Sequence, residues 1–232
     1  MDFSKELKGL GILLNEKTSY QFETYYQMLI EVNQVMNLTA ITEKEEVYRK
    51  HFLDSLEIVR ALDMKLPYTL CDVGSGAGFP SVPLAIVHKD VNVTIIDSLQ
   101  KRISFLEKLI QKLELPNVKA IHARAEDYSK EKRESFDVVT ARAVARLNIL
   151  AELCLPLTKV GGTFLAMKGS SGEAEFKEAS HAIEILGGRL EKVIHFTLPD
   201  EDDQRQILII KKIKSTPIKY PRNFNKIKER PL

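Results

Sequence analysis

Cysteine, histidine and long apolar runs are scarce in this chain of 232 residues. Its two cysteines, Cys71 and Cys154, are far apart in apolar surroundings, which predicts buried thiols rather than a disulfide or a metal pair. The five histidines form no ligand-spaced cluster, so we expect no metal site. No stretch reaches the roughly 18 apolar residues of a membrane span, and the acidic N-terminus is unlike a signal peptide. We therefore expect a cytoplasmic protein without a membrane partner.

The chain also lacks a strong charge excess, since its formal net charge is only +2. The charge is nevertheless uneven, because nine bases and a single acid lie between Arg205 and the C-terminus. Such a basic segment predicts a phosphate-contacting surface. A solvated edge strand followed by a disordered tail fits the same composition, and charge alone does not decide between them.

Two patterns of apolar spacing divide the sequence. Residues 1–65 repeat apolar side chains at spacings of three and four, which predicts a helical extension. Residues 66–214 alternate strand and helix patterns, and residues 215–232 form a basic tail. Strands are predicted at 68–73, 91–97, 117–123, 135–143, 160–169, 190–198 and 205–213. The order predicts an α/β fold with a mostly parallel sheet, an antiparallel last strand, and ligands at the carboxyl ends of the strands.

A glycine-rich turn, DVGSGAGFP, follows the first strand. It has no lysine, which excludes a Walker phosphate loop, and Phe79 occupies the third small position of the dinucleotide fingerprint. What remains is an acid followed by three alternate glycines. This pattern favours S-adenosylmethionine, whose amino-acid part and ribose need close backbone approach.

Residues at successive strand ends support this interpretation. We expect Asp72 near the ammonium of the ligand and the backbone of the turn against its amino-acid part and ribose, Asp97 on the ribose hydroxyls, and Ala125 with Glu126 beside the adenine. The turn residues concerned are Gly74, Gly76 and Gly78. The alternative role for Asp97 and Glu126 is helix N-capping.

The sequence resembles one family, the bacterial small-subunit ribosomal RNA guanine-N7 methyltransferase G family. The resemblance rests on NLTAIT (37–42), KHFLDSL (50–56), DVGSGAGFPSVPLAI (72–86), DSLQKRISFL (97–106), ARAVA (141–145) and MKG (167–169). It implies a Rossmann-like class I S-adenosylmethionine-dependent methyltransferase with seven strands, and methyl transfer to N7 of one guanine in the decoding-region loop of 16S rRNA. The family's cofactor contacts fall on Gly74, Phe79, Ala125, Glu126 and Arg142.

The residues agree with that chemistry. No Asp/Asn-Pro-Pro-aromatic motif of amine methylation follows the fourth strand, and neither cysteine is placed as a nucleophile. Guanine N7 has a free lone pair and needs no base, so the catalytic groups should orient rather than move protons. The candidates are Arg142, Lys168, His51 and Asp54, for each of which a structural ion pair or hydrogen bond is the alternative.

The predicted partner is 16S rRNA in the small ribosomal subunit or an assembly intermediate, bound by a monomer. Candidate RNA contacts are Arg146, Lys168, Lys211, Lys212, Lys214 and Arg222. Two other functions stay open from the residues alone: a methyltransferase for a small molecule or protein, and a non-enzymatic RNA-binding assembly factor.

Overall fold

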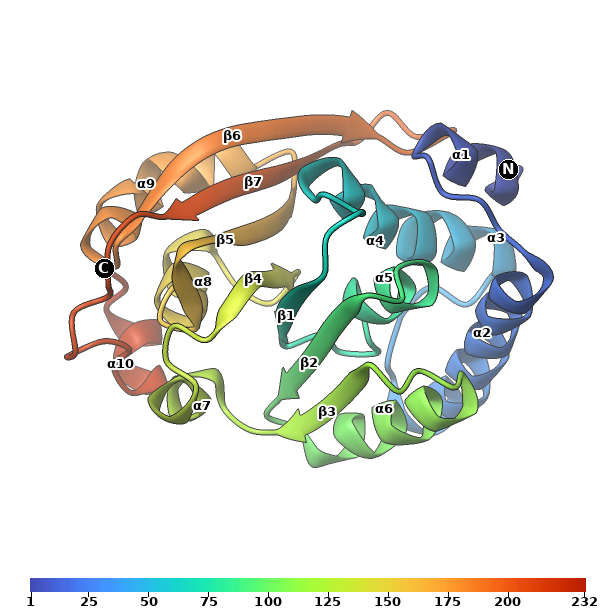
Figure 1. Cartoon of the computed structure of the whole chain (residues 1–232), viewed down its shortest axis with the longest axis horizontal. Helices are drawn as coiled ribbons and strands as arrows, with labels where there is room; N and C mark the ends of the chain where they lie inside the picture. Colours follow the sequence, from blue (N-terminus) through green and yellow to red (C-terminus); the bar gives the residue numbers. More distant parts are fainter.

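The computed structural model describes all 232 residues and is built on one seven-stranded sheet (Figure 1). The strands follow the order β3-β2-β1-β4-β5-β7-β6. Their bounds are β1 Tyr68–Val73, β2 Val91–Asp97, β3 Val118–His122, β4 Phe136–Arg142, β5 Thr158–Gly169, β6 Gly188–Thr197 and β7 Gln204–Lys212. β7 is antiparallel to both β5 and β6, and the pairs β1–β2, β1–β4, β2–β3 and β4–β5 are parallel. The predicted sheet, with its antiparallel last strand, is confirmed.

Helices cover both faces of the sheet, as near-continuous apolar strands require. One face packs against α5 (Ser81–Val87), α6 (Gln100–Lys112) and the 3-10 turn η2 (Glu57–Ala61). The other face packs against α7 (Ala125–Glu131), α8 (Leu147–Cys154) and α9 (Gly172–Ile185). The sheet therefore separates two apolar cores. Cys71 and Cys154 are both fully buried free thiols in the second core, as predicted.

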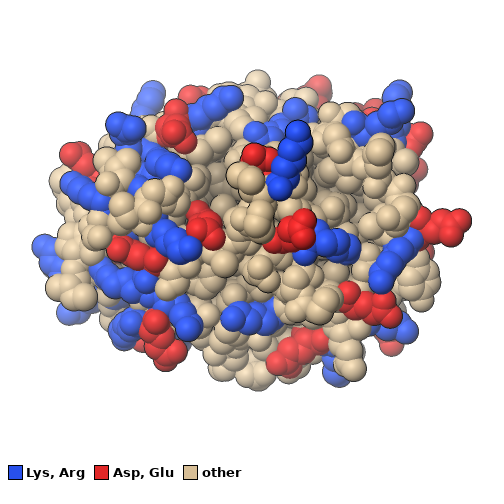
Figure 2. Space-filling model, in the orientation of Figure 1, with Lys and Arg blue, Asp and Glu red and all other residues tan.

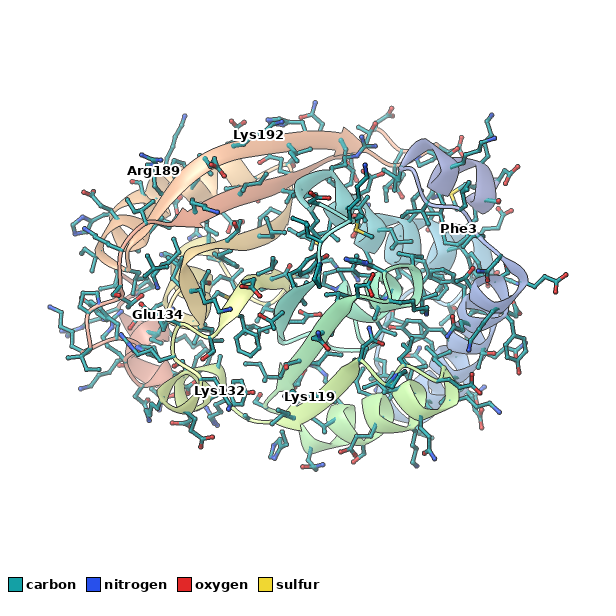
Figure 3. The ribbon with its side chains drawn as sticks, viewed as in Figure 1. Phe3, Lys119, Lys132, Glu134, Arg189 and Lys192 are labelled. Atoms are coloured by element: carbon teal, nitrogen blue, oxygen red, sulfur yellow. The ribbon has the colours of Figure 1, made fainter.

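The N-terminal residues are helical, as expected, and pack outside α5 and α6. They comprise α1 (Phe3–Gly9), α2 (Glu16–Met36), α3 (Lys44–Val47), the π-helical turn η1 (Tyr48–Leu53) and α4 (Asp54–Leu56). An aromatic cluster joins them: Phe3 meets Phe22 and Tyr48 edge to face, with ring centroids 5.2 and 5.0 Å apart (Figure 3). The Tyr25 hydroxyl donates to the Ala77 carbonyl at 2.7 Å, which fastens α2 to the glycine turn.

The C-terminal tail is folded against the domain. It ends in α10 (Phe224–Glu229), which packs on α8 through the buried side chain of Ile227. Glu134 accepts hydrogen bonds from the Thr216 amide and the Ser215 hydroxyl at 2.8 and 3.0 Å, at the start of the tail (Figure 3). No helix is both long and apolar enough to cross a bilayer.

Candidate functional site

The glycine turn after β1 has backbone conformations that favour glycine. Gly74 has φ +72°, and its amide donates to the Ile96 carbonyl at 2.8 Å, which ties the turn to β2. A Cβ at this position would lie 3.0 Å from the Val144 side chain. The turn therefore passes close beneath the loop that follows β4.

A crevice of about 310 Å³ opens where β1, β2 and β3 end. It is lined by Val73, Gly74, Ile96, Asp97, Ser98, Arg102, Ala123, Arg124, Ala125, Glu126, Ala143, Val144, Leu153 and Phe224. This is the edge at which parallel α/β sheets bind ligands. Four of the predicted cofactor residues, Gly74, Asp97, Ala125 and Glu126, meet here.

Asp97 is the fixed carboxylate of the crevice. Its side chain is almost fully buried; Oδ1 accepts from the Leu99 amide at 2.9 Å, and Oδ2 lies 3.3 Å from Arg102 Nη1. A carboxylate held this way at the end of β2 can still accept hydrogen bonds from ligand hydroxyls.

A second cavity of about 400 Å³, which we call the charged hollow, lies beside the crevice. Its walls are Lys50, His51, Asp54, Arg142, Ala143, Met167, Lys168, Gly169, Glu175, Phe196, Arg205 and Gln206. Ala143, at positive φ directly after β4, lines both cavities, so one residue separates them.

Asp54 links two cations of the hollow. Arg142 Nη1 donates to Asp54 Oδ2 at 2.6 Å, and Arg205 Nε lies 3.1 Å from Oδ1. The Arg142 guanidinium also lies over the Phe79 ring, 4.9 Å from its centroid. These contacts fix the guanidinium at the boundary of the two cavities.

Lys168 holds the loop after β4. Its ammonium donates to the Ala145 carbonyl at 2.6 Å and to Glu175 at 2.8 Å, and its side chain is only 8% exposed. Glu175 also accepts from the Leu147 amide at 2.8 Å. Burial raises the pKa of Glu175, but the hydrogen bond and charge of Lys168 outweigh burial and lower it. Lys168 is thus placed to position the loop rather than to reach a phosphate.

His51 forms part of the wall of the charged hollow. Its Nε2 pairs with the Thr39 hydroxyl at 2.7 Å, Nδ1 lies 3.2 Å from the Lys50 carbonyl, and the ring stacks on Phe79. Burial first, and then the charge of Arg142, lower the pKa of His51 to about 4. The imidazole is therefore neutral near pH 7, with both nitrogens engaged.

Five predicted cofactor residues lie outside the crevice walls, among them Arg142, which lines the charged hollow. Asp72 is fully buried beneath the turn, and Phe79 stacks between Tyr25 and His51. A Cβ at Gly78 would lie 2.7 Å from the Tyr25 hydroxyl, so this glycine admits α2 rather than a ligand. Gly76 is open, with nothing within 4 Å of a Cβ. In this structure the side chains of Asp72 and Phe79 support the turn, and their contact with the cofactor stays a prediction.

The predicted RNA contacts are dispersed. Arg146 is exposed just before α8, two residues after Val144 of the crevice wall, and pairs with Glu178 at 2.7 Å. Lys211 lies near the C-terminal end of β7, and Lys214 lies just beyond it. Both are at the end of the strand opposite the two cavities.

Two other predicted RNA contacts are engaged within the fold. Lys212 is fully buried and bonds the Leu155 carbonyl, the Thr216 hydroxyl and Glu134, so the prediction that it contacts RNA is wrong. Arg222 pairs with Glu152, which is buried on α8.

Sequence reasoning missed several wall residues. The sequence marks Arg205 only as one of the bases near the C-terminus, and it gives no signal for Glu175, Phe196 or Phe224. Each comes from a segment far from the glycine turn in sequence, and no local motif marks them.

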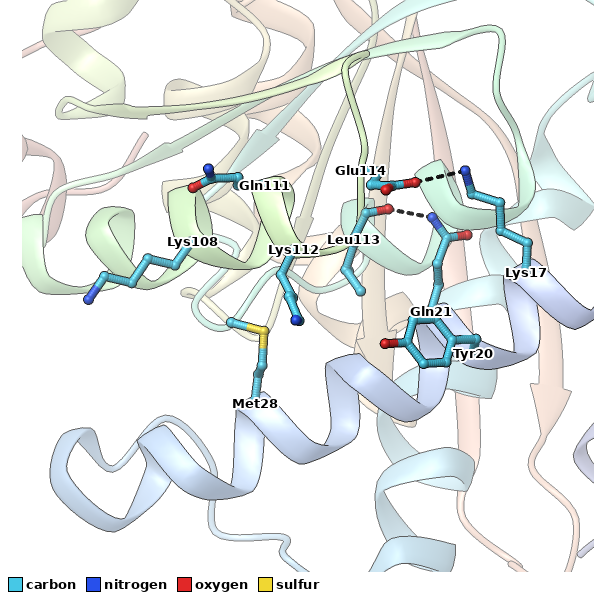
Figure 4. Close-up of a pocket in the computed structure, with 9 residues that line it drawn as sticks. All are labelled: Lys17, Tyr20, Gln21, Met28, Lys108, Gln111, Lys112, Leu113 and Glu114. Atoms are coloured by element: carbon cyan, nitrogen blue, oxygen red, sulfur yellow. Dashed lines mark hydrogen bonds and ion pairs between the residues drawn. The ribbon is translucent and has the colours of Figure 1, made fainter.

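A further cavity, of about 770 Å³, lies between α2 and the C-terminal end of α6 (Figure 4). Lys17 pairs with Glu114 at 3.0 Å across it, and Gln21 donates to the Leu113 carbonyl. These contacts dock the N-terminal helices onto α6, away from the strand ends. No group of three or more His, Cys, Asp or Glu residues is arranged to hold a metal.

Comparison with known proteins identifies the family. The sequence model described as rRNA small subunit methyltransferase G matches residues 18–208. The chain belongs to this family. Curated ribosomal RNA small subunit methyltransferase G proteins from Bacillus cytotoxicus and Bacillus cereus strain B4264 are 55% and 54% identical over 222 residues, covering 95% of this chain and 93% of each relative.

Solved structures place this member of the methyltransferase G family in a wider fold group. M. jannaschii TYW2 in complex with AdoMet superposes with TM-score 0.53 at 18% identity, covering 63% of this chain and 70% of that one. The 16S rRNA (adenine(1408)-N(1))-methyltransferase from Catenulisporales acidiphilia gives TM-score 0.52 at 15% identity, covering 67% and 94%. These likenesses concern the fold, which is that of class I methyltransferases.

Proposed function

We propose that this protein transfers a methyl group from S-adenosylmethionine to N7 of a guanine in the decoding-region loop of 16S rRNA. The observation that carries the proposal is the pair of cavities that meet at Ala143 on the carboxyl edge of the sheet. One has the features of a cofactor crevice, and the other has the size and polarity for a nucleobase. Membership of the rRNA small subunit methyltransferase G family supports the choice of RNA.

The crevice fits S-adenosylmethionine. Gly74 lines the crevice directly after β1, and the buried Asp97 offers a carboxylate for two ribose hydroxyls. Ala125 and Glu126, at the start of α7, would border the adenine. When bound, the cofactor supplies a methyl group activated by its sulfonium.

The chain needs no general base for this reaction. Guanine N7 carries a lone pair and no proton, so the protein has only to align it and exclude water. The neutral His51 has both ring nitrogens engaged and is placed to support the wall. Arg142, fixed between Asp54 and Phe79, is the orienting group at the junction of the two cavities.

The charged hollow offers partners suited to guanine. Among the bases, guanine presents two neighbouring donors, N1–H and the N2 amine, together with the acceptors O6 and N7. The carboxylates of Asp54 and Glu175 can accept from the donor edge, and the cations of the hollow can donate to O6. Phe196 supplies an aromatic surface on the same wall. Entry of the base requires that it be unstacked from its RNA loop, as in other base-modifying enzymes.

The decisive experiment supplies labelled S-adenosylmethionine and unmodified small ribosomal subunits, and maps the product by strand cleavage at N7-methylguanine. We expect one labelled guanine in the 16S rRNA. Label on another atom or base would refute the assignment. Transfer to a small molecule or protein alone, or no transfer despite RNA binding, would support one of the two other functions.

Asp54→Asn tests the orienting network. It keeps the shape of the side chain but removes the charge that holds Arg142 and Arg205, so we expect the transfer rate to fall roughly 10- to 100-fold. Affinity for S-adenosylhomocysteine, measured by calorimetry, should change little. Asp90→Asn, at an exposed acid just before β2, is the matched control. Equal rates for the two variants would remove Asp54 from the mechanism.

A further inference from the structure

The basic tail is anchored by contacts that are specific rather than merely electrostatic. Arg133, just after α7, donates to the carbonyls of Pro217 and Tyr220 at 3.1 and 2.9 Å, and also to that of Thr216. Charged groups that satisfy several backbone carbonyls fix a segment more firmly than exposed ion pairs do. The tail therefore follows a defined path across the surface.

A second anchor lies two residues before α10. Glu152 on α8 is fully buried, and its carboxylate accepts from the Arg222 amide at 2.8 Å, from Nε at 2.9 Å and from Nη2 at 2.6 Å. A buried carboxylate without a partner is costly, and Arg222 is the partner this one has. The sequence of α8 thus includes an acid whose environment is complete only when the tail is in place.

These anchors bring α10 to the cofactor crevice. Ile227 is buried in the second core, and Phe224, one helical turn earlier, is half-buried and lines the crevice. In Figure 1, α10 lies beside α7, the helix that begins at Ala125. Phe224 therefore extends an apolar wall formed by Leu153 and Ala125.

We propose that Phe224 is a cofactor-binding residue, and that its ring packs against the adenine of S-adenosylmethionine. The proposal rests on the proposed function, since it assumes that the crevice holds this cofactor. Adenine has apolar faces and a polar edge, so an aromatic wall complements its faces. Asp97, proposed for the ribose hydroxyls, leaves the faces of the adenine to these apolar residues.

This assignment gives the tail a role distinct from RNA contact. The bases of α10, Lys226 and Lys228, are exposed, whereas Phe224 faces the crevice. Loss of the tail would then weaken cofactor binding even without RNA. A tail that served only as an RNA surface would leave cofactor affinity unchanged.

The test is calorimetric titration of the full-length protein with S-adenosylhomocysteine and with 5′-methylthioadenosine, which keeps the adenine and ribose but lacks the amino-acid part. Phe224→Ala should raise the Kd for both ligands by the same factor, roughly tenfold. Phe224→Tyr, which keeps the ring, should stay within about twofold of the unmodified protein. Lys228→Ala, an exposed residue of the same helix, is the control and should bind normally.

The outcomes separate this inference from the function on which it rests. If the unmodified protein binds neither ligand, the cofactor assignment fails. If it binds both, and Phe224→Ala binds equally well or more tightly, the proposal for Phe224 is overturned. Should Phe224→Ala unfold, Phe224→Leu decides, because it retains apolar bulk without a ring: several-fold weaker binding supports the proposal, and unchanged binding refutes it.

Discussion

Asp72 precedes the glycine turn, and its carboxyl group is closed off from solvent. Oδ2 accepts a hydrogen bond from the Ser81 amide at 3.3 Å, and Oδ1 has no hydrogen-bond partner. Burial raises the pKa of Asp72 to about 7, although Ser81 and the charge of Arg142 act in the opposite direction. Between pH 4 and pH 7 the folded chain therefore holds a proton that the unfolded chain has released.

This difference fixes the sign of a pH effect. Because the folded state binds more protons in that window, the Asp72 contribution to stability is present at low pH and lost as pH rises through 7. Asp72→Asn removes this titration. We expect the free energy of unfolding of the unmodified protein, relative to that of the variant, to fall by on the order of 4 kcal/mol from pH 4 to pH 8. Urea unfolding at several pH values measures it, and parallel profiles would contradict it.

The face of a strand on which a given side chain lies is the feature that the sequence predicts least well. Lys211 and Lys212 are neighbours on β7, so their side chains point to opposite faces. β7 is an interior strand with apolar residues at consecutive positions, and its pattern does not tell which lysine is covered. The structure buries Lys212, and burial lowers its pKa to about 8 despite the opposing effect of Glu134.

At the scale of elements, strand and helix positions followed from the sequence closely. The predicted strands at 68–73 and 91–97 coincide with β1 and β2, because each is a short apolar run bounded by polar turns. α10 was not anticipated, since its six residues include only Phe224 and Ile227 as apolar positions. Its stability depends on the distant Glu152, which no local pattern reveals.

The docking of α2 on the glycine turn gives a prediction at this scale. A Cβ at position 78 would lie 2.7 Å from the Tyr25 hydroxyl and 2.8 Å from Val82, at φ +108°. Gly78→Ala should therefore cost about 2–4 kcal/mol in unfolding free energy. Gly76→Ala, at φ +63° with open space, should cost only about 1–2 kcal/mol. Equal losses in thermal or urea unfolding would show that α2 does not constrain the turn.

Across the whole molecule, basic side chains occur at both ends of the strands of the sheet but have different surroundings. Figure 2 shows Lys and Arg side chains gathered over α10 and the nearby ends of β6 and β7, with fewer acids among them. Arg146, by contrast, lies just before α8, two residues after Val144 of the crevice wall and one residue after Ala145, whose carbonyl binds Lys168 of the charged hollow. β7 pairs Arg205 with Gly169 at the cavity edge and Lys211 with Thr163 beyond it. At roughly 3.3 Å a residue, the two bases are separated by about 20 Å.

An RNA whose target base enters the charged hollow must place its nearest phosphates around the mouth of that hollow, at the carboxyl ends of the parallel strands. Arg146→Ala should therefore weaken binding to unmodified small subunits and lower the slope of log Kd against log salt by about one, because one phosphate contact is lost. Lys214→Ala removes an exposed charge just beyond the other end of β7 and should leave the slope unchanged. Filter binding across a series of KCl concentrations measures both variants. An equal drop in slope would mean that the RNA wraps the molecule from one edge to the other, and a drop for Lys214→Ala alone would place the RNA over the tail.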